Sequence, residues 1–167
     1  MIATAVAPIL MALPDDGSVL MDDHPLLRTV STPIEDFGES LSLLLEAMRK
    51  VASARLARGL AAVQIGVPLR ALIVRASGDY RREGEYLAFI NPTLERTLNR
   101  FVTDREGCLS IPPRKWGDVS RPAKCDATWL DEHGEHHSAT LTGDRARIFQ
   151  HEFDHLNGVL MTDRMAT

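Results

Sequence analysis

The residue types best suited to catalysis lie close together near the C-terminus, in the run Gln150-His151-Glu152-Phe153-Asp154-His155. In a helix, His151 and His155 would lie one turn apart on the same face, so both imidazoles could bind a single metal ion. Glu152 would then lie beside the ion, where a carboxylate can take a proton from metal-bound water. The run therefore predicts a helix that carries a water-activating metal site.

Two imidazoles leave a tetrahedral metal ion short of protein ligands, so a third ligand is expected from another segment. Cys108 is the best candidate, because Gly107 before it permits a close approach of the backbone. A lone cysteine is more often a small buried apolar side chain, and Cys125, within an alternating strand pattern, fits that interpretation. We therefore expect Cys108, and not Cys125, to complete the ligand set.

A third segment, Gly59-Leu60-Ala61-Ala62-Val63-Gln64-Ile65-Gly66, has small residues on both sides of one glutamine. Such a segment allows a backbone and an amide group to approach a ligand closely. Taken alone, it is better explained as a packed turn in which the glutamine is hydrogen-bonded within the protein.

Apolar residues at helical spacing predict the helix over 144–156 and a second, longer helix over 38–57, which Gly59 is expected to end. Between the helices lie short strands, predicted over 69–74, 86–90, 127–130 and 137–141. Asn91-Pro92 is expected to end the second strand, and residues 131–134 form the turn of a hairpin. This order predicts an α+β fold: short antiparallel sheets packed around a central C-terminal helix that carries the metal motif, with a second long helix nearer the N-terminus.

The chain of 167 residues fits one domain over 1–167. Its hydrophobic content of 44% and charged content of 25% are ordinary for a globular protein. A net charge of −4 without a stripe of Lys and Arg argues against binding to nucleic acid. His133, His136 and His137 belong to the polar hairpin and are expected to face solvent.

Residues 1–18 are expected to form an extension or an extra strand, with a turn over 15–18. Residues 1–13 are nearly all apolar, but no Lys or Arg occurs before Arg28, and a membrane span needs about 20 apolar residues. Neither a secretory signal nor a membrane span is predicted. Two cysteines cannot build a disulfide framework, which fits a reduced cytoplasmic setting.

Considered together, the runs GLAAVQ, EGCLS and QHEFDH, in this order and at this spacing, resemble the three signature motifs of peptide deformylase. The resemblance extends from about Asp22 to Asp163-Arg164. It implies a metal-dependent hydrolase that removes the formyl group from the N-formylmethionine of nascent proteins and releases formate. The expected partners are N-formylated nascent peptides at the ribosome, and the expected protein is a monomer in the bacterial cytoplasm.

The resemblance also implies roles at the metal. Cys108, His151 and His155 would be the ligands, and Glu152 would be the general base and then the general acid. Iron(II), Fe2+, would be the native ion, with Zn2+, Ni2+ or Co2+ as substitutes. A thiolate and two imidazoles are soft ligands that suit these ions, whereas magnesium and calcium prefer oxygen.

Further roles implied by the resemblance concern the substrate. Gln64 and the backbone N–H of Leu109 would hold the developing oxyanion, and Gly59 would pair with the substrate backbone. The other residues expected to contact the substrate are Arg58, Glu106, Gly107 and Arg114, with Lys115 as the alternative to Arg114.

The first motif departs from the family pattern. Ala57 replaces a glycine, Val63 replaces a proline, and Arg58 replaces an apolar residue that lines the methionine pocket. The Arg58 side chain has three open interpretations: it reaches out to water, it narrows the pocket, or it pairs with an acidic substrate group. Asp144 also opens the second helix where apolar residues are common.

Two alternatives to a deformylase remain open at this point. One is a metallopeptidase or another amidase that shares only the two-histidine helix, which leaves GLAAVQ and EGCLS unexplained. The other is a deformylase-like metal-binding protein with weak or altered substrate specificity, for which the altered first motif is the only support.

If Arg58 obstructs the methionine pocket, the Arg58→Ile variant should have a higher kcat/KM for formyl-Met-Ala-Ser than the unaltered protein, because the substitution restores an apolar wall. The measurement is formate release under oxygen-free conditions with iron(II) supplied. An unchanged or lower kcat/KM would count against obstruction by Arg58.

Overall fold

The structure is a computed structural model that describes residues 18–76, 85–97 and 100–165. The extension predicted over 1–18, with its turn over 15–18, lies outside these residues apart from Ser18. The helices are α2 (Glu39–Ala54) and α3 (Gly143–Leu156), with short 3-10 helices η1 (Pro25–Arg28), η2 (Ala62–Ile65), η3 (Pro113–Lys115) and η4 (Met161–Asp163). The strands are β1 (Gly59–Ala61), β2 (Ala71–Arg75), β3 (Tyr86–Thr97), β4 (Phe101–Glu106), β5 (Gly117–Pro122), β6 (Lys124–Leu130) and β7 (His136–Thr142).

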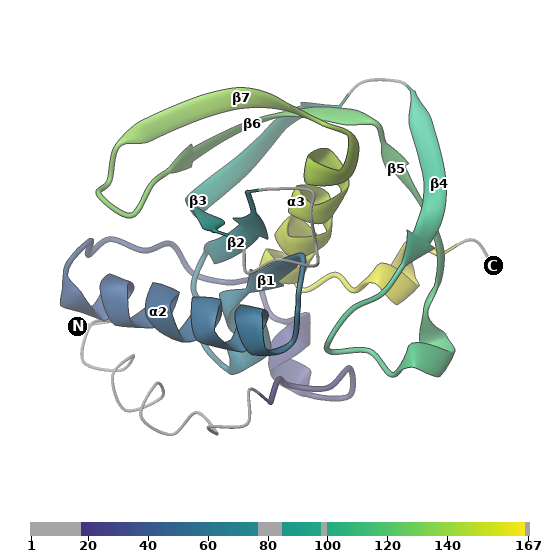
Figure 1. Cartoon of the computed structure of the whole chain (residues 1–167), viewed down its shortest axis with the longest axis horizontal. Helices are drawn as coiled ribbons and strands as arrows, with labels where there is room; N and C mark the ends of the chain where they lie inside the picture. The colour runs from purple at the N-terminus through teal and green to yellow at the C-terminus, as the bar shows by residue number, and fades with distance from the viewer. Residues whose placement is uncertain (1–17, 77–84, 98–99, 166–167) are drawn as a thin grey trace.

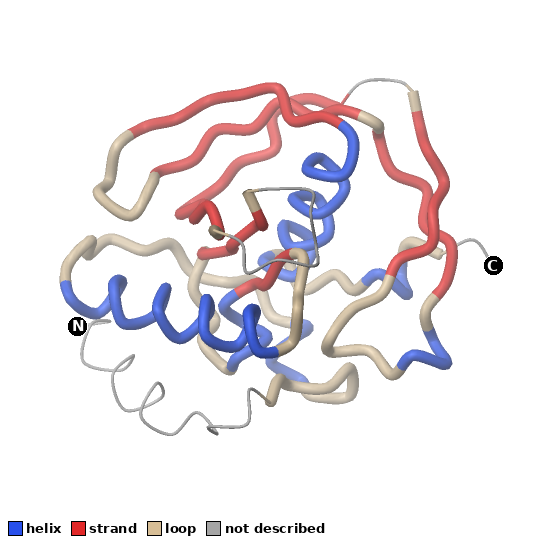
Figure 2. The backbone as a smooth tube through the Cα atoms, viewed as in Figure 1, coloured by secondary structure: helices blue, strands red, loops and turns tan. Residues whose placement is uncertain are grey.

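The strands form two antiparallel sheets, as the sequence predicts. Five strands pair in the order β1-β2-β3-β6-β7, and β4 pairs with β5 in a separate two-stranded sheet. Helix α3 lies in the middle of the molecule, between the five-stranded sheet and the β4–β5 pair, while α2 lies at one side (Figures 1 and 2). The prediction of an α+β fold around a central C-terminal helix is therefore confirmed.

Helix α3 is buried on most of its surface: its apolar side chains pack in the core, and several of its polar side chains are buried as well. Ala146, Phe149 and Leu156 have no solvent-exposed area, and Phe149 packs against Phe89 of β3 with ring centroids 5.3 Å apart. The helix contacts β1, β2, β5, β6 and β7. Because strands of both sheets surround it, the polar side chains of α3 that do not reach solvent must find partners inside the protein.

Two predicted boundaries are wrong. The first helix ends at Ala54 and not at Ala57, because Leu56 adopts a left-handed conformation (φ 51°) that stops helical hydrogen bonding before Gly59 is reached. Strand β3 continues through Asn91-Pro92 to Thr97. Asn91 takes φ 48° and the pairing of β3 with β6 shifts register there, so the proline, which has no N–H, lies at an irregularity in the ladder.

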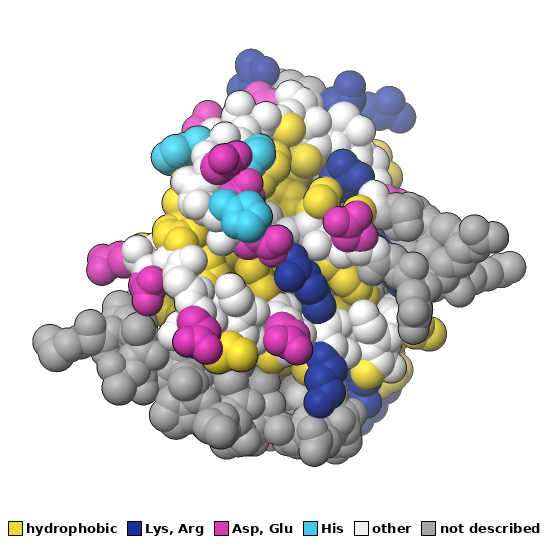
Figure 3. Space-filling view, turned by 60° about the vertical axis from the view of Figure 1, so that its left-hand side comes forward, with side chains coloured by type: hydrophobic (Ala, Val, Ile, Leu, Met, Phe, Trp, Pro, Cys, Tyr) yellow, Lys and Arg dark blue, Asp and Glu magenta, His cyan; other side chains and the backbone are white. Residues whose placement is uncertain are grey.

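The β6–β7 hairpin forms as predicted, and its histidines lie on the surface. His133, His136 and His137 are exposed, and Figure 3 shows histidine side chains gathered at one end of the molecule beside acidic side chains. Among the described residues, no helix is both long and apolar enough to span a membrane.

Candidate metal centre

Helix α3 and the segment after β4 bring the three predicted ligands together. One donor atom from each of Cys108, His151 and His155 lies within 4.8 Å of the others. The Sγ of Cys108 is 3.3 Å from Nε2 of His155, and the rings of His151 and His155 have centroids 5.1 Å apart. The predicted spacing of one helical turn therefore places both rings on the face of α3 that meets Cys108.

Cys108 lies in a close-packed turn that directly follows the end of strand β4. The N–H of Ile111 donates to the carbonyl of Cys108 at 3.1 Å, which reverses the chain after the cysteine. Gly107 allows this path, because a Cβ there would lie 2.8 Å from the ring of Trp116. Cys125, in contrast, is fully buried in β6 away from the histidines, as expected for an apolar role.

The carboxylate of Glu106 connects this turn to α3, the helix that carries both histidines. It accepts a hydrogen bond from Nδ1 of His151 at 2.9 Å and a bidentate pair from Arg121 at 2.7 and 3.0 Å. Arg147 is the third residue that donates to this carboxylate, at 2.7 Å, and Arg121 also donates to Asp154 at 2.8 Å. Because Nδ1 of His151 is engaged, Nε2 is the ring atom available to a metal ion.

Arg121 and Asp154 were not among the residues predicted from the sequence. A signal was present: Arg121 follows Val119 by two residues in a strand, so the two side chains point to the same face, and Val119 is fully buried. An arginine at an inward position needs a buried carboxylate partner, and the motifs supply Glu106 and Asp154.

Burial and hydrogen bonding shift the pKa values of the ionisable groups of the site in different directions. Desolvation favours the neutral form of Glu106, but hydrogen bonds from His151 and Arg121 outweigh it and lower the pKa of Glu106 to about 2. Burial opposes a charge on His151, yet bonds to Cys108 and Glu106 raise its pKa well above the usual range. Desolvation and the nearby His151 cation lower the pKa of His155 well below its usual range.

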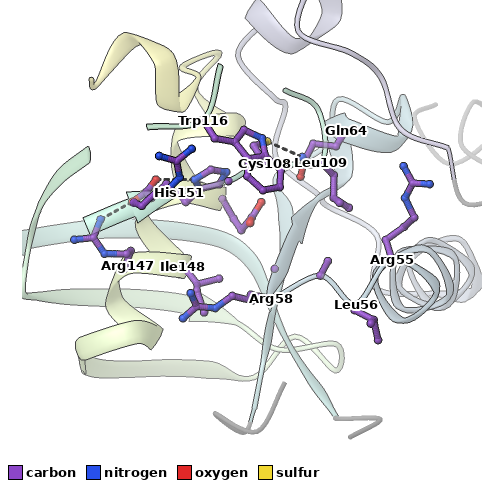
Figure 4. Close-up of a pocket in the computed structure, with 16 residues that line it drawn as sticks. Arg55, Leu56, Arg58, Gln64, Cys108, Leu109, Trp116, Arg147, Ile148 and His151 are labelled. Atoms are coloured by element: carbon purple, nitrogen blue, oxygen red, sulfur yellow. Dashed lines mark hydrogen bonds and ion pairs between the residues drawn. The ribbon is translucent and has the colours of Figure 1, made fainter. Parts of the chain in front are cut away.

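A cavity of about 340 Å³ lies beside the donor cluster, and Cys108, His151 and Glu152 are among the residues that line it (Figure 4). Desolvation raises the pKa of the buried Glu152 carboxyl to about 7. Gly59 faces this carboxylate so closely that a Cβ there would lie 2.7 Å from its Oε1. The backbone of β1 therefore lies directly beside the group expected to act as base.

Gln64 and Leu109 also line the cavity. The Gln64 amide is held by its own turn: Oε1 accepts from the N–H of Ala61 at 2.9 Å, and Nε2 lies 3.1 Å from Oγ of Ser110 and 3.5 Å from Sγ of Cys108. No acceptor in the described part of the chain meets the N–H of Leu109.

Of the other residues predicted to contact substrate, Arg58 lines the cavity, whereas Arg114 and Lys115 do not. Arg58 lines the cavity and forms an ion pair with Asp144 at 2.7 Å, which joins the start of β1 to the start of α3. Arg114 is exposed on η3 and is not among the residues that line the cavity. Lys115 forms an ion pair with Asp22 at 2.6 Å.

The donor set fits a transition metal. One sulfur and two imidazoles suit iron or zinc, and three protein ligands leave a coordination position for water or substrate. Glu152 Oε2 is buried without a hydrogen-bond partner in the described residues, and buried polar atoms usually have one. Three donors beside such a carboxylate are typical of a metal-dependent hydrolase.

Comparison with known proteins gives the family. The chain matches the family model described as polypeptide deformylase over residues 17–167. It is 38% identical over 152 residues to a peptide deformylase from Rhizorhabdus wittichii, which covers 89% of this chain and 85% of that protein. The chain belongs to the polypeptide deformylase family.

Solved structures agree. The fold is similar to a peptide deformylase from Plasmodium falciparum, with a TM-score of 0.85 and 32% identity over 90% of this chain and 87% of that one. It is also similar to the class I type b peptide deformylase of Acinetobacter baumannii with Met-Ala-Ser bound, with a TM-score of 0.81 and 28% identity over 88% of this chain and 96% of that one. The predicted family and activity are confirmed: the protein is a metal-dependent hydrolase that removes formyl groups from nascent peptides.

We expect Glu106→Gln to weaken metal binding about 10- to 100-fold, because the amide cannot hold His151 and both arginines as the carboxylate does. The measurement is metal retention against a competing chelator. Glu132→Gln is the matched control, since among the residues that the structure describes Glu132 pairs only with Arg49, at the surface. Equal metal affinity of Glu106→Gln and Glu132→Gln would contradict the orienting role of Glu106.

Proposed function

We propose that Cys108, His151 and His155 hold the metal ion of this deformylase, and that iron(II) is the native ion, with zinc, nickel or cobalt able to replace it. The observation that carries the proposal is the proximity of these three donors to one another, beside a cavity that Cys108, His151 and Glu152 line. When bound there, the ion would supply Lewis acidity, which activates both water and the formyl carbonyl.

In this proposal Glu152 moves the protons. Its carboxylate takes a proton from the attacking water, whose oxygen forms a bond to the formyl carbon. As the C–N bond breaks, the same carboxyl returns a proton to the leaving amine, so formate and a free N-terminus are the products. The burial of Glu152 supports this role, because a carboxylate shielded from bulk water exchanges protons mainly with what enters the cavity.

Gln64 and the N–H of Leu109 would stabilise the negative charge that develops on the formyl oxygen. Each such donor contributes about 3–4 kcal/mol in comparable acyl-transfer sites. The support for Gln64 is its fixed placement: the residue is 2% exposed and its amide lies beside Cys108. A donor fixed in advance does not have to reorganise during the reaction.

The substrate would be an N-formylmethionyl peptide that lies along β1 and pairs with the backbone at Gly59. The relative from Acinetobacter baumannii, solved with Met-Ala-Ser bound, supports a peptide of this kind. We infer that the protein acts in the bacterial cytoplasm on peptides leaving the ribosome, since its substrates are made there.

We expect Glu152→Ala to keep its bound metal and to lose at least about 100-fold in kcat for formyl-Met-Ala-Ser, because general acid–base catalysis typically contributes 10²–10⁴-fold. Cys108→Ser is the comparison variant and should lose metal and activity together. Metal content and formate release are measured on the same oxygen-free samples. A Glu152→Ala variant with normal kcat would remove Glu152 as the base.

A further inference from the structure

The cavity has a charge opposite in sign to that of the whole chain. The chain has 19 Lys and Arg against 23 Asp and Glu, for a net charge of −4. The cavity, however, is lined by four arginines and two glutamates; the arginines are Arg55, Arg58, Arg105 and Arg147. A concave surface of one charge sign concentrates ligands of the opposite sign.

Two of the four arginines are committed to carboxylates of the protein. Arg147 is 9% exposed and donates to Glu106, and Arg58 pairs with Asp144. Figure 4 shows Arg147 and Arg55 on opposite sides of the cavity, with Arg58 between them. These ion pairs join α3 to neighbouring segments, so their charges are largely balanced within the protein.

Arg55 and Arg105 differ from this pair. Both are exposed, Arg55 just after α2 and Arg105 on β4, so they approach the cavity from different elements. Asp118 lies opposite Arg105 in the β4–β5 register, but neither arginine has a carboxylate within 4.0 Å in the described part of the chain. Their positive charges are therefore available to a ligand.

We propose that Arg55 and Arg105 form a subsite for carboxylate side chains of the formylated peptide, at the residues that follow its first one. The inference rests on the proposed function, in which the formyl group is held at Cys108, His151 and His155. The first residue then occupies the cavity, and the residues after it pass the exposed arginines. The protein accordingly selects nascent peptides with Asp or Glu directly after the formylated residue.

The test compares three peptide amides, formyl-Met-Asp-Glu, formyl-Met-Asn-Gln and formyl-Met-Lys-Lys. The amides remove the terminal carboxylate, and the second peptide matches the first in shape without its charge. At low salt we expect kcat/KM for the acidic peptide to exceed that for its neutral match roughly fivefold, mainly through KM, since each exposed ion pair contributes little. The lysine peptide should be the poorest substrate, and about 0.5 M salt should remove the differences.

The variant that tests the residues is Arg55→Gln/Arg105→Gln, in which the ratio of acidic to neutral kcat/KM should fall to about one. Arg100→Gln is the matched control, because Arg100 is exposed just before the opposite end of β4 and does not line the cavity; it should keep the ratio. A ratio of one in the unaltered protein, or a full ratio in the double variant, would overturn the subsite and leave the deformylase assignment intact. No formate from any of the three peptides would overturn both.

Discussion

The site depends on the hydrogen bonds and ion pairs that the carboxylate of Glu106 forms. Glu106 is 6% exposed, lies at the end of β4, and binds His151 of α3, Arg121 of β5 and Arg147 of α3 at the same time. A buried carboxylate that loses its partners costs about 3–5 kcal/mol. The two-stranded sheet and α3 are therefore held in one arrangement, and this arrangement brings Cys108, two residues after Glu106, to the histidines.

The same ion pairs stabilise the fold and hold the residues of the candidate metal site in place. Arg121 is shared between Glu106 and Asp154, and Asp154 lies between the two histidines proposed as metal ligands in the sequence of α3. His151 is hydrogen-bonded to Glu106, and His155 directly follows Asp154 in the sequence. Both carboxylates have fixed partners inside the protein. A site built in this way has little freedom to reorganise, and such preorganisation is what electrostatic stabilisation of a transition state requires.

The sequence predicts the parts of the molecule that have local signals. The spacing of His151 and His155 predicts both the helix and its ligand face, and alternation predicts the β6–β7 hairpin. Strands β4 and β5 were missed because β4 is exposed at five of its six positions and has no apolar face. Arg121 was missed because β5 was missed: its inward position, two residues after Val119, is visible only once that strand is recognised, and its partner Glu106 lies 15 residues away. The boundary at Leu56 depends on a left-handed backbone that leucine rarely adopts.

The most direct test of the account is X-ray absorption spectroscopy of the metal-loaded protein, because it identifies the atoms bound to the ion. With zinc, the account predicts one sulfur at about 2.3 Å and two imidazole nitrogens at about 2.0–2.1 Å. The sulfur signal should vanish in Cys108→Ser and persist in Cys125→Ser. A metal shell without sulfur in the unaltered protein would contradict the central claim that Cys108, His151 and His155 bind one ion.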